Sequence, residues 1–297
     1  MSVWFITGAS RGFGRALTDA ALAAGDQVVA AARNPHPSDP AGLRLDVRLD
    51  VRLDVRLDVT EPAQAEAAVA AAVERFGRID VLVNNAGYGL FGAVEEVPDA
   101  DVRALFDTNV FGLLNVTRAA LPVLRAQGAG HVVNISSSAG FASGAGRGLY
   151  SASKFAVEGL SEALRAEVGP LGIHVTVVEP GSFRTDFLAP ASRRRVAVAS
   201  PAYTGSVGAV LSAIEANSGH QPGDPARAVT AIRHLVTAPQ PPLRLQLGSD
   251  CVRLVEDKLA TVAGELGQWR ALATSTDYAA EALADPVHQP RIGRRSR

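Results

Sequence analysis

Tyr150 and Lys154 are the first residues whose types and spacing could do chemistry. They lie four positions apart in a segment that predicts a helix over 150–169, so both side chains are expected on one helix face. A free tyrosine titrates near pH ~10 and is a poor proton carrier at neutral pH, but a nearby ammonium lowers the pKa of a phenol. The chain has only two lysines among its 29 basic residues. The pair therefore predicts a site of proton transfer.

A glycine-rich segment near the N-terminus could hold a phosphate. It follows an apolar run at 2–7 and precedes a predicted helix over 13–24. Glycines at such a position let the backbone turn tightly and approach a pyrophosphate, whose charge the helix N-terminus stabilises. The spacing is not the GxGxxG of two-domain dehydrogenases. The predicted cofactor-binding residues here are Thr7, Gly8, Ser10, Arg11, Gly12, Phe13 and Gly14.

The elements that must position these residues alternate along the chain. Short apolar runs predict buried strands at 2–7, 27–32, 79–84, 131–136 and 173–179. Amphipathic, Ala-rich segments predict helices near 13–24, 61–76, 99–127 and 150–169. This alternation is typical of right-handed βαβ units. We therefore expect an α/β fold with a doubly wound parallel sheet of the Rossmann type.

The rhythm of alternating elements ends near residue 180. Residues 185–225 hold several prolines and three consecutive arginines but no long period, which predicts a flexible flap over a site. A helix at 225–238, a strand at 243–247 and a helix at 250–268 are expected to follow as a C-terminal helical extension. With 297 residues, the chain suits one domain with this extension. Residues 281–297 are expected to form a disordered tail.

The sequence Arg-Leu-Asp-Val occurs four times in tandem over residues 44–59. Leu and Val alternate with charged residues, which favours an extended strand with one apolar face over the alternative of a helix. The copies offer equivalent pairing registers, so slippage between them is the physical concern. One copy is expected to occupy a central strand. We interpret the other copies as the expansion of a short coding repeat that has no function of its own.

Composition and charge exclude several classes of protein. The net charge of −1 does not indicate a nucleic-acid surface. The single cysteine cannot form an internal disulfide, no signal peptide is recognisable, and no apolar window reaches the length of a membrane span. The cytoplasm is the expected location. The six histidines show no metal-ligand spacing, so no metal site is expected.

Together the motifs resemble the short-chain dehydrogenase/reductase family over roughly residues 1–185. The glycine segment is similar to the family's TGxxxGxG pattern, and further motifs follow in the family's order. They are NNAG at 84–87, an Asn at 109, a Ser at 137, YxxxK at 150–154 and a Pro-Gly turn at 180–181. The resemblance implies that residues 1–280 form a single dinucleotide-binding oxidoreductase domain.

The resemblance also implies roles for individual residues. Ser137, with the serines on either side as alternatives, would bond the substrate oxygen, and Asn109 would hold a water linked to Lys154. Lys154 would also bond the nicotinamide ribose. The predicted catalytic residues are Asn109, Ser137, Tyr150 and Lys154, and Tyr150 and Lys154 are counted with the cofactor site as well. The other cofactor residues implied by the resemblance are Asp58, Val59, Asn85, Ala86, Gly87, Pro180, Gly181, Phe183 and Thr185.

The choice of cofactor depends on the end of the second strand. An NAD enzyme of this type would place an acidic residue there to bond both ribose hydroxyls, but Ala32 stands at that position. Arg11 and Arg33 could instead flank a 2′-phosphate with charge-assisted bonds. We therefore expect NADP(H) in preference to NAD(H). The resemblance gives Asp58 an adenine contact, and Asp54 is the alternative if the repeat slips by one copy.

These observations predict an NADP(H)-dependent oxidoreductase that interconverts a ketone or aldehyde and an alcohol, with Tyr150 as proton donor or acceptor. Small apolar residues in the flap favour a mid-sized apolar substrate. Family members commonly associate through the helices corresponding to 99–127 and 150–169, which implies a homodimer or homotetramer. The alternatives are an NAD(H)-dependent alcohol dehydrogenase of the same fold, a non-catalytic NADP(H)-sensing protein, and a chain disabled by the repeat.

Overall fold

A computed structural model describes residues 1–35, 51–188, 192–196 and 198–278. The chain divides into two compact units, residues 1–255 and residues 256–297. Each is considered by itself. The tail predicted at 281–297 and the first copy of the tandem repeat lie outside the described residues.

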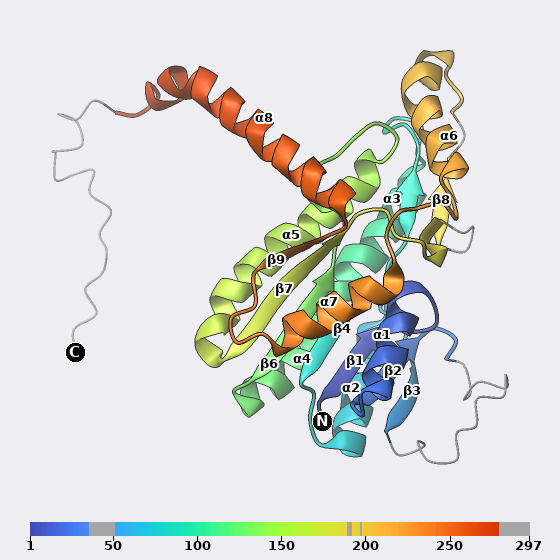
Figure 1. The fold of residues 1–297 in the computed structure, drawn as a ribbon, viewed down its shortest axis with the longest axis vertical. Helices are drawn as coiled ribbons and strands as arrows, with labels where there is room; N and C mark the ends of the chain where they lie inside the picture. Colours follow the sequence, from blue (N-terminus) through green and yellow to red (C-terminus); the bar gives the residue numbers. More distant parts are fainter. Residues whose placement is uncertain (36–50, 189–191, 197, 279–297) are drawn as a thin grey trace. The chain divides into compact units, whose positions relative to one another are not determined.

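A seven-stranded parallel sheet forms the centre of the first unit (Figure 1). The strand order is β3-β2-β1-β4-β6-β7-β9, and every pairing is parallel. The prediction of a Rossmann-type sheet is thus confirmed. The strands are β1 (Val3–Thr7), β2 (Gln27–Ala32), β3 (Arg52–Arg56), β4 (Val81–Asn84), β6 (Gly130–Ile135), β7 (Ile173–Pro180) and β9 (Arg244–Leu247).

Helices cover both faces of the sheet, because the strands are apolar on both sides. One buried cluster joins the sheet to α1 and α7, and a second joins it to α2, α4 and the end of α5. The helices of the first unit are α1 (Gly12–Ala23), α2 (Pro62–Phe76), α3 (Asp99–Phe106), α4 (Gly112–Gln127), α5 (Gly148–Val168), α6 (Ala209–Ala216) and α7 (Pro225–Thr237). Helix α8 (Ser249–Thr274) starts in the first unit and continues into the second.

The strand order reverses between β1 and β4. In a doubly wound sheet a ligand binds outside the carboxyl ends of the strands at such a switch point. The residues that follow β1 and β4 are the glycine-rich segment and the NNAG element. The topology therefore brings these two sequence motifs to one crevice.

The tandem repeat supplies a strand, as predicted, but not a central one. Strand β3 spans the whole third copy and the first residue of the fourth, and it pairs only with β2 at the edge of the sheet. The expectation of a central strand is therefore wrong. An edge strand has one neighbour, so its alternating Leu and Val contact the core from one face while Arg and Asp stay partly exposed.

The helix predicted over 99–127 is confirmed, but one turn of it is not α-helical. Helices α3 and α4 are separated by a π-helical turn at Asp107–Phe111, which contains the predicted residue Asn109. Such one-turn π segments occur often at functional sites. The segment predicted as a flap contains α6 and a short strand, β8 (Arg193–Arg195), which pairs with β5 (Gly89–Phe91). Its flexibility stays a prediction.

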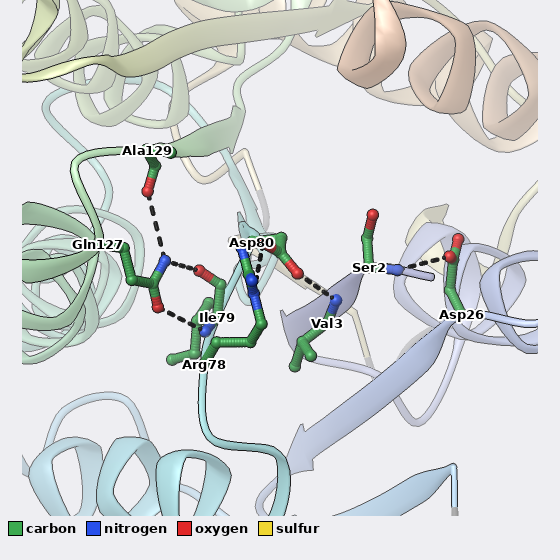
Figure 2. Close-up of polar contacts among 8 residues, drawn as sticks. All are labelled: Ser2, Val3, Asp26, Arg78, Ile79, Asp80, Gln127 and Ala129. Carbon is green, nitrogen blue, oxygen red and sulfur yellow. Dashed lines mark hydrogen bonds and ion pairs between the residues drawn. The ribbon is translucent and has the colours of Figure 1, made fainter.

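Polar contacts fix the starts of the strands at the edge opposite the crevice (Figure 2). The Asp80 carboxylate accepts hydrogen bonds from the Val3 amide, at 2.8 Å, and from the Arg78 guanidinium. The Gln127 side chain bonds both backbone groups of Ile79 and the Ala129 carbonyl. These bonds tie β1, β4, the end of α4 and the approach to β6 together.

Replacing Asp80 with Ala should therefore lower stability without affecting the crevice. Hydrogen bonds to charged groups contribute roughly 1.5–3 kcal/mol each, so we expect the free energy of unfolding in urea to fall by about 2 kcal/mol. Asp99, whose side chain is 92% exposed in a loose pair with Arg103, provides the control. Asp99→Ala should change stability by less than about 0.5 kcal/mol. Equal losses in the two variants would contradict this account.

Candidate active site

A cavity of about 770 Å³ opens at the carboxyl edge of the sheet. It is lined by almost all the predicted site residues, although they come from seven separate parts of the chain. Only Thr7, Gly14 and Asn109 do not reach its surface. The predicted residues in its wall are Gly8, Ser10, Arg11, Gly12, Phe13, Arg33, Asp58, Val59, Asn85, Ala86, Gly87, Ser137, Tyr150, Lys154, Pro180, Gly181, Phe183 and Thr185.

The glycine-rich segment requires glycine for two different reasons. Gly8 and Gly12 have φ angles of +65° and +55°, which strain any residue with a Cβ atom. Gly14 has ordinary backbone angles, but a Cβ atom there would collide with the Gly8 carbonyl oxygen and with Nδ2 of Asn85. Helix α1 starts at Gly12 and has no acidic residue in its first turn. Its N-terminus is therefore open to an anion.

Thr7 and Asn85 hold this segment against the end of β4. The Thr7 hydroxyl accepts hydrogen bonds from the backbone amides of Asn85 and Ala86, at 2.9 and 3.0 Å. The Asn85 side chain donates to the carbonyls of Thr7 and Gly8. Thr7 is thus a residue behind the cavity wall that shapes the loop, rather than one exposed in the cavity.

Tyr150 lies in the cavity wall with 5% of its surface exposed. Burial raises the pKa of its phenol to about 12, while a hydrogen bond with Ser137 and the charge of Arg147 oppose the rise. From the sequence we expect a net fall in this pKa, whereas burial produces a net rise. The Lys154 ammonium lies 5.9 Å from the centre of the phenol ring and donates to the Ile135 carbonyl at 2.8 Å.

Lys154 itself is buried, and burial lowers its pKa to about 8. The charge of Glu158, one turn further along α5, opposes this shift. At neutral pH Lys154 is thus an ammonium and Tyr150 a neutral phenol. A neutral phenol is the form that can donate a proton.

Asn109 contacts the site from behind. Its side chain accepts a hydrogen bond from the Tyr88 amide and donates to the Tyr88 carbonyl, both at 3.0 Å, and it also donates to Ser153. A Cβ atom on Gly87 would lie 3.0 Å from Asn109 Oδ1 and 3.8 Å from Lys154 Nζ. Gly87 therefore leaves the space between these two side chains open, and the predicted water link between them stays a prediction.

The residues from which NADP(H) was predicted lie at the end of β2 and beside it. Ala32 ends the strand, and Arg33 follows it in the cavity wall together with Arg11. Asp58, from the last repeat copy, also lines the cavity, whereas Asp54 pairs with Arg52 in β3 and lies outside it. In this structure the repeat has therefore not slipped by one copy, and Asp58 rather than Asp54 reaches the cavity.

Three residues that the sequence did not point to line the cavity near Tyr150. Phe91 and Phe187 lie with their ring centres 6.0 and 5.7 Å from that of Tyr150. Arg147, at the start of α5, also lines the cavity. Phe91 belongs to a three-residue strand, too short for a periodicity to reveal. Only the position of Arg147 three residues before Tyr150 could have identified it.

The residues of the cavity wall fit a dinucleotide. Glycine is required where a Cβ atom would crowd the turn into α1, and the cavity wall holds Arg33 at the end of β2 and Arg11 at the start of α1. Among the described residues, no group of three or more His, Cys, Asp or Glu side chains could hold a metal ion. No helix in the described part of the chain is long and apolar enough to cross a membrane.

Comparison with known proteins agrees with the geometry. The family described as short chain dehydrogenase matches residues 2–195. Oxidoreductase BOA17 of Botryotinia fuckeliana is 37% identical over 92% of this chain and 98% of its own length. A 3-ketodihydrosphingosine reductase of Bacteroides thetaiotaomicron is 37% identical over 82% of this chain and 86% of its own length.

Solved structures extend the similarity to the fold and to cofactor-bound proteins. A short-chain dehydrogenase from Streptomyces avermitilis is 42% identical with a TM-score of 0.85, covering 93% of this chain and all of the other. A Burkholderia phymatum protein in complex with NAD is 27% identical, with a TM-score of 0.72 over 91% and 95% of the chains. A Burkholderia cenocepacia protein in complex with NADP is 25% identical, with a TM-score of 0.68 over 90% and 96%.

Fold, cavity and relatives together define an oxidoreductase with a nicotinamide-cofactor site. More narrowly, the chain belongs to the short-chain dehydrogenase/reductase family.

Proposed function

We propose that the protein reduces a ketone or aldehyde to an alcohol, or runs the reverse reaction, with NADP(H) and with Tyr150 as the proton donor or acceptor. The observation that carries this proposal is that the buried Tyr150 phenol, Ser137 and Lys154 share the wall of one cavity, with Tyr150 and Lys154 on one helix face. A general acid, a group to hold the substrate oxygen and a cation are thus within one site.

The roles of the residues follow from this arrangement. When bound, the nicotinamide supplies or accepts the hydride. Ser137 and Tyr150 would hold the carbonyl oxygen, and the neutral Tyr150 phenol would donate its proton to that oxygen as the alcohol forms. The Lys154 ammonium favours the phenolate that remains. Asn109 would keep the water that returns a proton to this pair, in the space that Gly87 leaves open beside it.

The test is a titration of purified protein with NADPH, followed by a screen of ketones and aldehydes. Binding should raise the fluorescence of the reduced nicotinamide, and turnover should consume NADPH only when a carbonyl compound is added. Tight NADPH binding without reduction of any carbonyl compound in the screen would favour the alternative of a sensing protein. Absence of binding would contradict the proposal.

We propose NADPH rather than NADH because of Arg11 and Arg33 beside Ala32. Arg33→Ala should weaken NADPH binding about 10- to 100-fold, since a hydrogen bond to a charged group contributes roughly 1.5–3 kcal/mol. NADH binding should barely change, because NADH lacks the 2′-phosphate. Arg227, whose side chain is 90% exposed outside the cavity wall, is the control, and Arg227→Ala should leave both affinities unchanged. Equal losses for the two nucleotides would exclude the phosphate contact.

A mid-sized or elongated apolar substrate fits the remaining wall. Phe91 and Phe187 lie beside Tyr150, and the cavity is also lined by Leu188, Val210 and Ile214. The relative named as a 3-ketodihydrosphingosine reductase acts, by its name, on a ketone with a long apolar chain. Ketones with an apolar body are accordingly the first compounds to screen.

The proposal extends to a homodimer or homotetramer formed through the helices around 99–127 and 150–169. Phe111 in the π-helical turn and Phe155 in α5 are 53% and 45% exposed. Large aromatic side chains on a surface gain most from burial against a second copy. Their positions on the two predicted interface elements support this assembly.

A further inference from the structure

Helix α5 carries a third polar residue below Tyr150 and Lys154. Glu158 follows Lys154 by four residues, so the three side chains are stacked along one face of the helix. Only 6% of Glu158 is exposed. A Cβ atom on Gly140 would lie 3.2 Å from both the Glu158 carboxylate and the Lys154 Cβ. An acidic group is thus buried directly behind the lysine of the site.

The charge of Glu158 is held by a residue from the far edge of the sheet. Arg244 in β9 donates from Nε to Glu158 Oε2 at 3.0 Å, and its Nη2 donates to Glu162, which is 63% exposed. An unpaired buried carboxylate would instead take up a proton. The ion pair with Arg244 therefore favours the charged form of Glu158.

A second buried carboxyl group lies beside this pair. Glu179 in β7 is completely buried, accepts a hydrogen bond from Gln246 at 3.1 Å and lies 3.6 Å from Arg244 Nε. Burial and the neighbouring charge of Glu158 raise the pKa of Glu179 to about 7. Burial also raises the pKa of Glu158, while Ser136, Arg244 and Lys154 oppose that rise. One guanidinium faces both carboxyl groups and lies nearer to Glu158, at 3.0 Å, so the ion pair favours the charge on Glu158 over Glu179.

We propose that Glu158 is a positioning residue for Lys154, whose ammonium it keeps charged beside Tyr150 through a buried carboxylate anchored by Arg244. The inference rests on the proposed function only for the role of Lys154 in proton transfer. The titratable and polar groups around Glu158 come from several elements. They are Lys154 and Glu162 on α5, Ser136 after β6, Glu179 on β7, Arg244 on β9 and Cys251 at the start of α8.

The direction of the effect follows from the charges. Burial lowers the pKa of Lys154 to about 8, and the Glu158 carboxylate opposes that shift. Without the carboxylate, the ammonium would be lost at a still lower pH, within the neutral range. Cys251 cannot replace the charge, because burial and nearby acidic groups raise the pKa of its thiol to about 12.

The composition of the chain makes a direct measurement possible. Lys154 and Lys258 are its only lysines, so lysine labelled with carbon-13 at Cε gives two NMR signals. Lys258 is exposed and serves as the internal reference. Titrating the full-length protein should show Lys154 losing its proton at a pH of about 8, below the ordinary range of a lysine. In Glu158→Gln the Lys154 midpoint should move down by about one pH unit or more, as expected for loss of an opposite charge.

Matched variants separate this role from a general effect on folding. Glu162→Gln removes the exposed partner of the same arginine and should leave the Lys154 midpoint unchanged. Glu158→Asp keeps a carboxylate and should restore most of the shift. An unchanged midpoint in a folded Glu158→Gln variant would overturn the proposal.

The unmodified protein offers a second measurement if Glu158→Gln does not fold. The Lys154 signal should then show an additional inflection on the acid side, where the pair of Glu158 and Glu179 takes up its second proton. Absence of this inflection would also overturn the proposal. Both NMR experiments are independent of turnover, so a failure of the proposed function, seen as no reduction of any ketone, remains distinguishable from a failure of this one.

Discussion

Replacing Tyr150 with Phe is expected to lower turnover by about 10²–10⁴-fold, the usual contribution of a general acid or base. The substitution removes one oxygen and keeps the ring, which packs between Phe91 and Phe187. Because the phenol is 5% exposed and already neutral, its loss leaves no buried charge unpaired. NADPH affinity and thermal stability should therefore stay close to those of the unmodified protein.

Tyr203 provides the matched control for this experiment. It lies in a short helical turn outside the cavity wall and is packed near α6. Tyr203→Phe should retain full turnover with the same ketone. If Tyr150→Phe kept more than about a tenth of the rate, proton transfer would have to come from another group, and the assignment of Tyr150 would be wrong.

The sequence predicted the site well because its residues are anchored to regular elements. Gly8, Asn85 and Ser137 each follow a buried strand, and Tyr150 and Lys154 share a helix face, so period and spacing alone placed them at one sheet edge. The same reasoning could not find contacts that depend on packing. Burial, which the linear sequence does not reveal, raises the pKa of Tyr150, whereas the sequence led us to expect that Lys154 would lower it.

Elements formed by long-range pairing were the ones the sequence could not predict. Strand β5 exists because β8, about a hundred residues later, pairs with it. The tandem repeat has equivalent registers in isolation, and the register observed, with Ala32 opposite Arg56, depends on β2 and on the apolar contacts of Leu57 and Val59. Likewise, Arg244 lies 86 residues from Glu158, and nothing local to either residue indicates their ion pair.

The second large effect is expected at Gly14, which lies behind the cavity wall. Gly14→Ala should weaken NADPH binding by about 10- to 100-fold, because overpacking costs roughly 1–3 kcal/mol and each 1.4 kcal/mol changes affinity about tenfold. The added methyl group would collide with the Gly8 carbonyl and the Asn85 side chain. These two residues shape the loop that approaches the phosphate, so the strain displaces backbone that the nucleotide must contact.

Gly159→Ala is the control for this prediction, because it makes the same substitution at a position outside the glycine-rich segment. It lies in the interior of α5, and a Cβ atom there would meet no atom within 4 Å. Since Ala is favoured over Gly in helices by about 1 kcal/mol, Gly159→Ala should keep NADPH affinity and raise the midpoint of thermal unfolding. Fluorescence titration and thermal unfolding of both variants provide the comparison. If Gly14→Ala bound NADPH as tightly as Gly159→Ala, the segment from Gly8 to Gly14 would not be the phosphate-binding loop, and the cofactor site would have to be placed elsewhere.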